Sequence, residues 1–320
     1  MRAVGEPAGR LPVLVLSGPT GSGKTDWAIA LARAAPVEIV SVDSALVYRG
    51  LDIGTAKPPA RLRALIPHHL VDICEPTESY SAGRFVADAL AAIDAIHARR
   101  RLPLLVGGTM LYLRALLVGL ASLPEASPAL RAELNERARL LGWPALHTQL
   151  ARLDPAAAAR IAAADGQRIQ RALEVCLSAG RPISELQRAT VSPLAGWPVH
   201  HWMLVPGARA LLHERLAQRF RAMMAAGFLE EVRSLHTRGD LTARHPAMRA
   251  VGYRQLWGHL DGDYNLEDAV ERGVAATRQL AKRQLTWMRS EKSGEPIDPL
   301  RTEPLSWIRD TCARLAAFGF

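Results

Sequence analysis

At residues 18–25 the chain reads Gly18-Pro19-Thr20-Gly21-Ser22-Gly23-Lys24-Thr25, the complete GxxxxGK[ST] pattern of a phosphate-binding loop. An apolar run precedes the pattern at residues 11–16, and a helical periodicity follows it at residues 26–35. Glycines let consecutive backbone N–H groups surround phosphate oxygens, Lys24 adds a positive charge, and Thr25 offers a hydroxyl to Mg²⁺. Because strand, loop and helix follow in the required order, these residues are predicted to bind a phosphate or a diphosphate.

The first third of the chain alternates short apolar runs with helical patterns. The runs at residues 13–16, 37–42 and 102–106 are uninterrupted and rich in leucine or β-branched residues, as buried parallel strands are. Residues 81–101 place their apolar side chains on one helical face. This order predicts an α/β fold of the phosphate-loop NTPase type, a parallel sheet flanked by helices with ligands at the carboxyl ends of the strands.

The composition changes near Leu120, where Pro124, Ser127 and Pro128 interrupt regular structure. From there the chain is rich in alanine, leucine and arginine and has no convincing strand, which predicts an all-helical insertion over residues 121–199. Residues 1–120 and 200–290 are then expected to form the phosphate-loop core, with a helical C-terminal part. Residues 291–320 are predicted to be a C-terminal tail with a short helix that the chemistry does not need.

The charge balance indicates an anionic partner. The chain has 320 residues, 49% of them hydrophobic, and a net charge of +9. Only four of its 40 basic residues are lysines. Such an arginine-rich composition can be a genome-wide tendency, so the net charge alone is weak evidence for an anionic partner. Residues 242–260 and 272–290, however, contain basic residues and no acidic one. Such stretches favour contact with a polyanion such as nucleic acid over an ordinary solvated surface of mixed charge.

Several classes of site are not expected. Cys74, Cys176 and Cys312 are isolated from one another, which argues against a disulfide framework or a zinc site. The pairs at residues 68–69 and 200–201 are adjacent histidines, which point to opposite faces of a strand and so suit a metal poorly. Neither a signal peptide nor a membrane span is expected. We therefore expect a cytoplasmic protein without a membrane partner. A monomer is a separate expectation.

Polar residues follow two of the predicted strands. Asp43 follows the run at residues 37–42, and Gly107-Gly108-Thr109 follows the run at residues 102–106. In a parallel sheet both groups would lie beside the phosphate loop. Asp43 could be a magnesium ligand, a general base or a helix cap, whereas paired glycines suit close approach of the backbone to a ligand. A strand ending in glycine rather than in Asp or Glu disfavours an ATPase and suits an enzyme that holds a leaving diphosphate.

The ordered motifs resemble those of the bacterial tRNA dimethylallyltransferases, also called tRNA isopentenyltransferases or the IPP transferase family. The resemblance extends from about residue 14 to residue 289. Its segments, besides the phosphate loop, are residues 41–48, 51–58, 105–112, 167–175, 249–255 and 276–284.

This resemblance implies transfer of a dimethylallyl group from dimethylallyl diphosphate to the exocyclic amine of the adenosine 3′ of a tRNA anticodon, with release of diphosphate and with Mg²⁺ as cofactor. It implies that Asp43 takes the amine proton, that Thr109 contacts the diphosphate, and that residues 21–25 hold the donor. It also implies that an arginine meets the diphosphate, for which we favour Arg219 over Arg215.

By the same resemblance, contacts with the tRNA anticodon stem-loop are expected from three groups of residues. The first two are the strand-end residues Asp43, Ser44, Ala45 and Leu46, and Arg131 with Gln167, Arg168, Ile169, Gln170 and Arg171 in the insertion. The third comprises Arg249, Ala250, Val251, Gly252, Tyr253, Arg254, Lys282, Arg283, Gln284 and Arg289.

Three other hypotheses remain at this point. A nucleoside or nucleotide kinase shares the loop, the sheet and a helical lid, and an RNA-binding phosphate-loop protein without catalysis would leave Asp43 and Thr109 unused. An enzyme that prenylates free adenine nucleotides is closest in chemistry, but the basic region of residues 249–289 favours a large polyanion.

Overall fold

The structure is a computed structural model that describes residues 10–121, 123–124, 127–188, 190–316 and 318–320. It divides into two compact units, unit 1 with Met1–Ala115 and Leu194–Phe320 and unit 2 with Leu116–Pro193. The second unit begins and ends a few residues earlier than the predicted insertion of residues 121–199. Among the described residues, no helix has both the length and the apolar character needed to cross a membrane.

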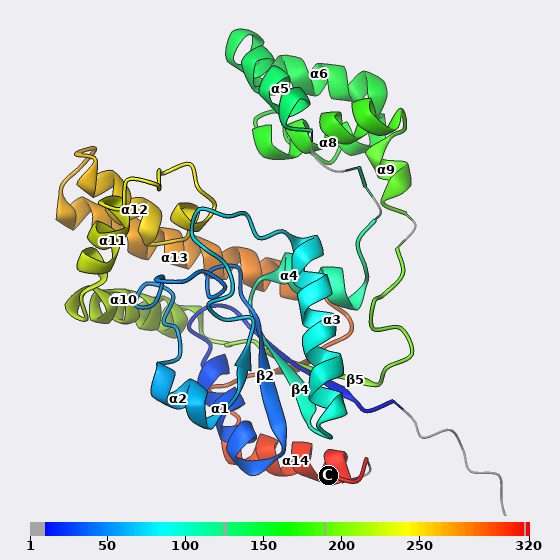
Figure 1. Ribbon diagram of the computed structural model, residues 1–320, viewed down its shortest axis with the longest axis vertical. Coiled ribbons are helices and arrows are strands. Elements are labelled where there is room, and N and C mark those ends of the chain that lie inside the picture. The colour runs from blue at the N-terminus through cyan, green and yellow to red at the C-terminus, as the bar shows by residue number, and fades with distance from the viewer. Residues whose placement is uncertain (1–9, 122, 125–126, 189, 317) are drawn as a thin grey trace, which may run out of the picture. The chain divides into compact units, whose positions relative to one another are not determined.

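Unit 1 is built on a six-stranded sheet in the order β3-β2-β4-β1-β5-β6, and every pairing is parallel (Figure 1). Its strands are β1 (Val13–Ser17), β2 (Val37–Val42), β3 (His68–His69), β4 (Leu102–Gly107), β5 (Val199–Leu204) and β6 (Glu295–Ile297). The three uninterrupted apolar runs form β1, β2 and β4, the centre and one side of the sheet. The predicted parallel α/β fold is therefore confirmed.

The helices of unit 1 flank this sheet and extend beyond its carboxyl edge. They are α1 (Lys24–Ala34), α2 (Ala60–Leu65), α3 (Ala82–Ala98), α4 (Met110–Leu117), which runs into unit 2, α10 (Arg209–Ala225), α11 (Phe228–His236), α12 (Tyr253–Leu260), α13 (Leu266–Met288) and α14 (Pro304–Ala316), with a 3-10 turn at Ala247–Arg249. One core cluster packs Trp27 and Leu31 of α1 onto Leu14, Leu16 and Leu104. Intervening strand residues are equally buried, and α3 lies against β2 and β4. Burial on both faces explains why these strands lack polar alternation.

The segment predicted to be a C-terminal tail is part of this core. Residues 295–297 form β6, which pairs with β5 at the edge of the sheet, and α14 packs against α1. The Trp307 ring lies 5.3 Å from the Trp27 ring and 5.4 Å from the Trp202 ring, centroid to centroid. The sequence did not predict this role, because one short strand and one helix carry little periodic signal by themselves. The links that precede them also contain Gly and Pro.

Unit 2 is all helical in its described residues, as predicted. Its helices are α5 (Pro128–Leu141), α6 (Trp143–Leu153), α7 (Pro155–Ala158), α8 (Gly166–Ala179) and α9 (Ile183–Leu186). Leu134, Leu150 and Ile169 meet in its apolar core. The buried Asp154 carboxylate caps α7 through Ala157 N–H at 2.9 Å and also accepts from the backbone and hydroxyl of Ser184, each at 2.8 Å. This cap joins two short helices that their own length would not stabilise.

We expect Trp307→Ala to lower the free energy of unfolding by about 3–5 kcal/mol, because it removes a buried indole from the three-tryptophan contact and leaves a cavity. Urea denaturation followed by circular dichroism measures the change. Leu305→Ala, on the exposed side of the same helix with 71% of the side chain accessible, should change stability by no more than about 0.5 kcal/mol. Equal effects of the two substitutions would contradict a core role for α14.

Candidate active site

The phosphate-binding pattern forms the connection from β1 to α1, at the carboxyl edge of the sheet. Helix α1 begins at Lys24, and no side chain caps its N-terminus. The first N–H groups of the helix are therefore free to meet an anion. Lys24 Nζ donates to Pro19 O at 2.7 Å, so the ammonium is folded back over the loop. Desolvation lowers the pKa of Lys24 to about 8; nearby Asp43 opposes this shift and Arg219 adds to it.

The structure brings Asp43 and Thr109 together at the ends of β2 and β4. Thr109 Oγ1 accepts from Ser44 N–H at 3.0 Å and lies 3.4 Å from Ser44 Oγ. Asp43 Oδ1 accepts from Ala45 N–H at 2.8 Å and from Leu46 N–H at 3.4 Å. One carboxylate oxygen of Asp43 thus caps the turn that follows β2. Capping and proton transfer are compatible roles, because the cap orients the carboxylate and uses only one of its two oxygens.

The paired glycines at the end of β4 serve close packing of the chain with itself. A Cβ on Gly107 would lie 2.0 Å from Val42 O, and a Cβ on Gly108 would lie 2.8 Å from Gly18 O. These glycines therefore have a structural reason besides the predicted close approach of the backbone to a ligand. They let the ends of β2 and β4 and the phosphate loop approach one another more closely than any side chain allows.

Gln284 of α13 links the phosphate loop to the end of β4 and does not project into solvent. Its Oε1 accepts from Thr20 N–H at 2.9 Å, and its Nε2 donates to Gly108 O at 2.8 Å. The side chain is 9% exposed. A residue predicted to contact tRNA instead joins α13 to the phosphate loop and to the end of β4. The sequence could not reveal this, because the partners of one bond lie 264 positions apart in the chain.

Of the two candidate arginines on α10, Arg219 is the one near the site. Its guanidinium interacts electrostatically with Asp43 and Asp26, and it lowers the pKa of Lys24. Part of its side chain is exposed, yet desolvation lowers the pKa of Arg219 from its usual value, against the raising effect of the two carboxylates. A guanidinium group stays protonated even when burial lowers its pKa. The electrostatic interaction of Arg219 with Asp43 and Lys24 thus favours it over Arg215 as the arginine that could meet an anion held by the loop.

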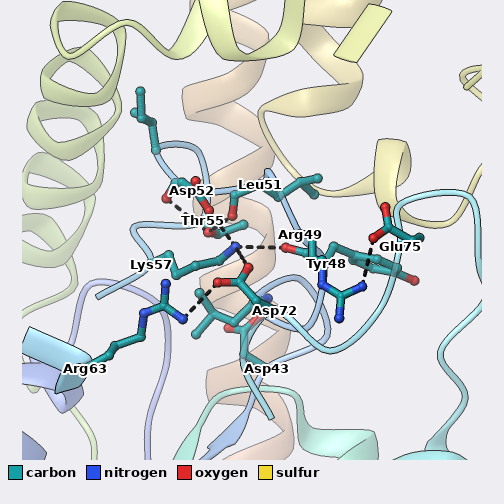
Figure 2. A network of polar contacts seen from close by, with 12 residues as sticks. Asp43, Tyr48, Arg49, Leu51, Asp52, Thr55, Lys57, Arg63, Asp72 and Glu75 are labelled. Atoms are coloured by element: carbon teal, nitrogen blue, oxygen red, sulfur yellow. Dashed lines mark hydrogen bonds and ion pairs between the residues drawn. The ribbon is translucent and has the colours of Figure 1, made fainter. Parts of the chain in front are cut away.

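A buried lysine organises the loop that follows Asp43. Lys57 Nζ donates to Tyr48 O at 2.8 Å, Asp52 Oδ1 at 2.6 Å and Asp72 Oδ1 at 2.5 Å, and Figure 2 shows Lys57 amid these partners. Only 2% of the Lys57 side chain is exposed. Sequence reasoning assigned it no role, although it is one of four lysines and lies in the quoted segment of residues 51–58.

The remaining residues of unit 1 that were predicted to contact tRNA differ in their exposure to solvent. Exposed side chains belong to Ser44, Arg249, Arg254, Lys282, Arg283 and Arg289, while Ala45, Leu46, Ala250 and Val251 are half-buried. Gly252 and Tyr253 are buried, and Tyr253 has no exposed side-chain surface. The side chain of Tyr253 therefore cannot touch RNA in this conformation.

The residues of unit 2 that were predicted to contact tRNA also differ in their exposure to solvent. Gln167 and Arg168 are exposed, whereas Ile169 is fully buried in the apolar core. Gln170 donates to Asn135 Oδ1 at 2.8 Å and to Arg131 O at 3.3 Å.

Two arginines of unit 2 share one buried carboxylate. Arg131 Nε lies 2.7 Å from Glu174 Oε1, and Arg171 Nη1 lies 3.5 Å from Glu174 Oε2. Glu174 is 1% exposed. Burial of a carboxylate requires such compensation, so Arg131 and Arg171 have a structural role besides any contact with RNA.

The described residues contain no group of three or more His, Cys, Asp or Glu that could hold a metal ion. His201 Nε2 lies 2.8 Å from Ser17 Oγ, and burial lowers the pKa of His201 to about 4, so this histidine is neutral at physiological pH. The residues at the phosphate loop could hold a Mg²⁺ ion only through few protein ligands. Thr25 offers an exposed hydroxyl at the start of α1, and ligand phosphate oxygens and water would complete the coordination.

Two family models match this chain. The model described as IPP transferase matches residues 46–291, and the model described as isopentenyl transferase matches residues 11–66. The tRNA dimethylallyltransferase of Alkalilimnicola ehrlichii is 61% identical over 290 residues, which cover 91% of each chain. The tRNA dimethylallyltransferase of Bordetella parapertussis is 56% identical over 304 residues, 94% of this chain and 97% of the relative.

Solved structures are similar over most of the chain. The tRNA isopentenylpyrophosphate transferase of Bacillus halodurans matches with a TM-score of 0.69 and 34% identity over 97% of both chains. A eukaryotic dimethylallyltransferase, whose crystal structures follow its action on tRNA, matches with a TM-score of 0.75 and 27% identity, covering 95% of this chain and 77% of the other.

The lowered pKa of Lys24 predicts proton uptake when diphosphate binds. In the free protein Lys24 is protonated at pH 7 and largely neutral at pH 9, because its pKa is about 8. A bound anion favours the charged form and raises the pKa, so binding near pH 8.5 should take up protons and binding near pH 6.5 should take up few. Calorimetry of diphosphate binding in buffers of different ionisation enthalpy measures the uptake. Lys24→Met is the control that corrects for protonation of diphosphate itself, and equal uptake in both proteins would refute the assignment.

Proposed function

We infer that this chain, which belongs to the IPP transferase family, transfers a dimethylallyl group to tRNA. We further propose that the donor is dimethylallyl diphosphate and that the acceptor is the exocyclic amine of the adenosine 3′ of the anticodon. The observation that carries this function is the family match over residues 46–291, with 61% identity to a tRNA dimethylallyltransferase over 290 residues. Grouping of Asp43 and Thr109 beside the phosphate loop supports the chemistry.

The donor side of the reaction uses the phosphate loop. As the bond between the allylic carbon and the diphosphate oxygen breaks, negative charge grows on the leaving group. The free N–H groups at the start of α1, Lys24 and Arg219 are suited to stabilise this charge. Thr25 would hold Mg²⁺ together with diphosphate oxygens, and the bound ion would add positive charge at the leaving group.

The acceptor side requires a base. An adenine amine is a weak nucleophile, because its lone pair is delocalised into the ring. As its nitrogen forms the new bond to the allylic carbon, a proton must leave that nitrogen, and Asp43 is the carboxylate available to accept it. Thr109, which lies against Ser44 at the end of β2, would contact the diphosphate. The target base must also leave its stack to reach this site.

The decisive experiment incubates the protein with labelled dimethylallyl diphosphate, Mg²⁺ and bulk tRNA, followed by nucleoside analysis. Label should appear in one modified adenosine, and ATP should not replace the donor. A nucleotide kinase would instead transfer phosphoryl groups from ATP. An enzyme for free nucleotides would label AMP and spare tRNA, an outcome disfavoured by the exposed Arg249, Arg254 and Lys282. The expected cytoplasmic location and monomeric state stay predictions.

Asp43→Asn should lower the rate of transfer by about 10²–10⁴-fold, because an amide retains the capping oxygen but cannot accept the proton. Asp43→Ala should abolish transfer, because it removes the base and also the oxygen that caps the turn after β2. Affinity for tRNA, measured by filter binding, should fall much less in both variants. Turnover of Asp43→Asn at the rate of the unmodified protein would remove the assignment of Asp43 as the base.

Lys282→Gln and Arg278→Gln should weaken tRNA binding and reduce the slope of log affinity against log salt by about 1 each, because each removes one phosphate contact. The matched control is Arg309→Gln, which removes an exposed arginine of α14, and its slope should equal that of the unmodified protein. An unchanged slope in the two α13 variants would count against a phosphate role for this helix.

A further inference from the structure

We propose that Glu231 is a positioning residue for the transfer reaction, and this inference rests on the proposed function. Its carboxylate ties residues 249–254, a segment proposed to contact tRNA, to the loop of residues 43–57 that begins with Asp43. Neither the sequence motifs nor the resemblance to the family assigned a role to Glu231. Its place in the fold is on α11, outside both segments that it joins.

The Glu231 carboxylate accepts four hydrogen bonds. Oε2 accepts from the backbone N–H groups of Asp52 at 3.0 Å and Ile53 at 2.7 Å, and Oε1 accepts from Gly54 N–H at 3.1 Å. Oε1 also accepts from the Tyr253 hydroxyl at 2.5 Å. Three consecutive N–H groups form a concave site for an anion, and here a side chain of the protein occupies it. The two carboxylate oxygens offer about four lone-pair sites, which accommodate all four donors.

Packing holds the two segments against α11 at the same place. A Cβ on Gly54 would lie 2.1 Å from the Phe228 ring and 2.7 Å from the Tyr253 ring, so this position accepts only glycine. The Phe228 and Tyr253 rings themselves meet edge to face with centroids 4.9 Å apart. The Tyr253 side chain has no exposed surface. Tyr253 therefore serves residues 249–254 as an internal anchor rather than as a contact with RNA.

The other side of the loop is held by Lys57, and this link continues toward Asp43. Lys57 Nζ contacts the Asp52 carboxylate and Tyr48 O, as Figure 2 shows. Asp52 is thus held by its backbone through Glu231 and by its side chain through Lys57. Residues 46 and 47, in the turn that Asp43 caps, accept from the backbone of residues 72–74 at 2.9–3.2 Å.

These contacts form a continuous chain of bonds from the basic segment to the carboxylate base. The path begins at Tyr253 and passes through Glu231, Asp52 and Lys57 to Tyr48. Tyr48 N–H donates to Ala45 O at 3.2 Å, and Ala45 N–H donates to the Asp43 carboxylate at 2.8 Å. Arg249 and Arg254, which flank Tyr253 closely, are exposed and available to phosphates. A bound RNA strand would therefore be held by a segment whose distance from Asp43 is set by Glu231. Loosening that tie would misplace the amine relative to its base without removing any contact with RNA.

Glu231→Gln tests the proposal. With donor and tRNA both saturating, the single-turnover rate should fall on the order of 10- to 100-fold, because small misplacements of reacting groups have effects of this size. The dissociation constant for tRNA should change little. Hydrogen exchange at the amides of residues 52–54 should accelerate, while the amides of β1 and β4 keep their protection. The matched control is Glu230→Gln, which removes the neighbouring exposed carboxylate that pairs with Arg233, and it should change none of these quantities.

Tyr253→Phe provides the second variant, since it keeps the buried ring and removes only the hydroxyl. It should lower the rate in the same direction, and Glu231→Gln should cost less in its background than alone, because the two groups share one bond. Unaltered rates in both single variants, or additive effects in the double variant, would overturn the proposal. If Glu231→Gln also loses protection from hydrogen exchange in β1 and β4, the substitution has disturbed the whole fold. The transfer rate and the hydrogen exchange of Tyr253→Phe then decide whether the proposal holds. If the unmodified protein transfers no dimethylallyl group, the proposed function fails, and the proposed coupling to Asp43 fails with it. Normal protection from hydrogen exchange at residues 52–54 in Glu231→Gln would instead overturn only the proposed link through Glu231.

Discussion

The site depends on the parallel register of three strands. Gly107 of β4 pairs with Ser17 of β1 on one side and with Val42 of β2 on the other. Because all three strands run in one direction, the chain leaves each of them at the same edge of the sheet. The phosphate loop, the turn that begins at Asp43 and the segment that begins at Gly108 therefore emerge side by side.

Residues from the second half of the chain secure this edge. Gln284 of α13 bonds both the phosphate loop and the end of β4, and Glu231 of α11 bonds three consecutive amides of the loop at residues 52–54. Arg219 of α10 lies within electrostatic reach of Asp43 and Lys24. The N-terminal half thus supplies the groups proposed for the chemistry, and the helices after β5 hold them and add charge.

Buried charges in this protein are compensated and placed at joints between segments. Lys57 joins the carboxylates of Asp52 and Asp72, and Glu174 of unit 2 joins Arg131 and Arg171. Each pairing orients several side chains at once, and removal of one partner would leave an uncompensated charge. For Arg131 and Arg171 this means that the same side chains that neutralise Glu174 also present part of their surface to solvent. Lys24 differs, since its desolvated ammonium donates to one backbone oxygen and keeps the capacity to meet an anion.

The sequence alone determined the parallel sheet, the phosphate loop, the family resemblance, and the presence of Asp43 and Thr109 after their strands. These features are local: apolar runs, glycine spacing and strand-end residues are legible within about ten neighbouring positions. Only the tertiary structure decided that Gln284, Ile169 and Tyr253 face inward, that α14 belongs to the core, and that Arg219 rather than Arg215 lies near Asp43. It alone revealed the bonds of Lys57 and Glu231. Burial and hydrogen-bond partners at these positions come from segments far apart in the chain, and no local pattern encodes which distant donor a side chain will meet.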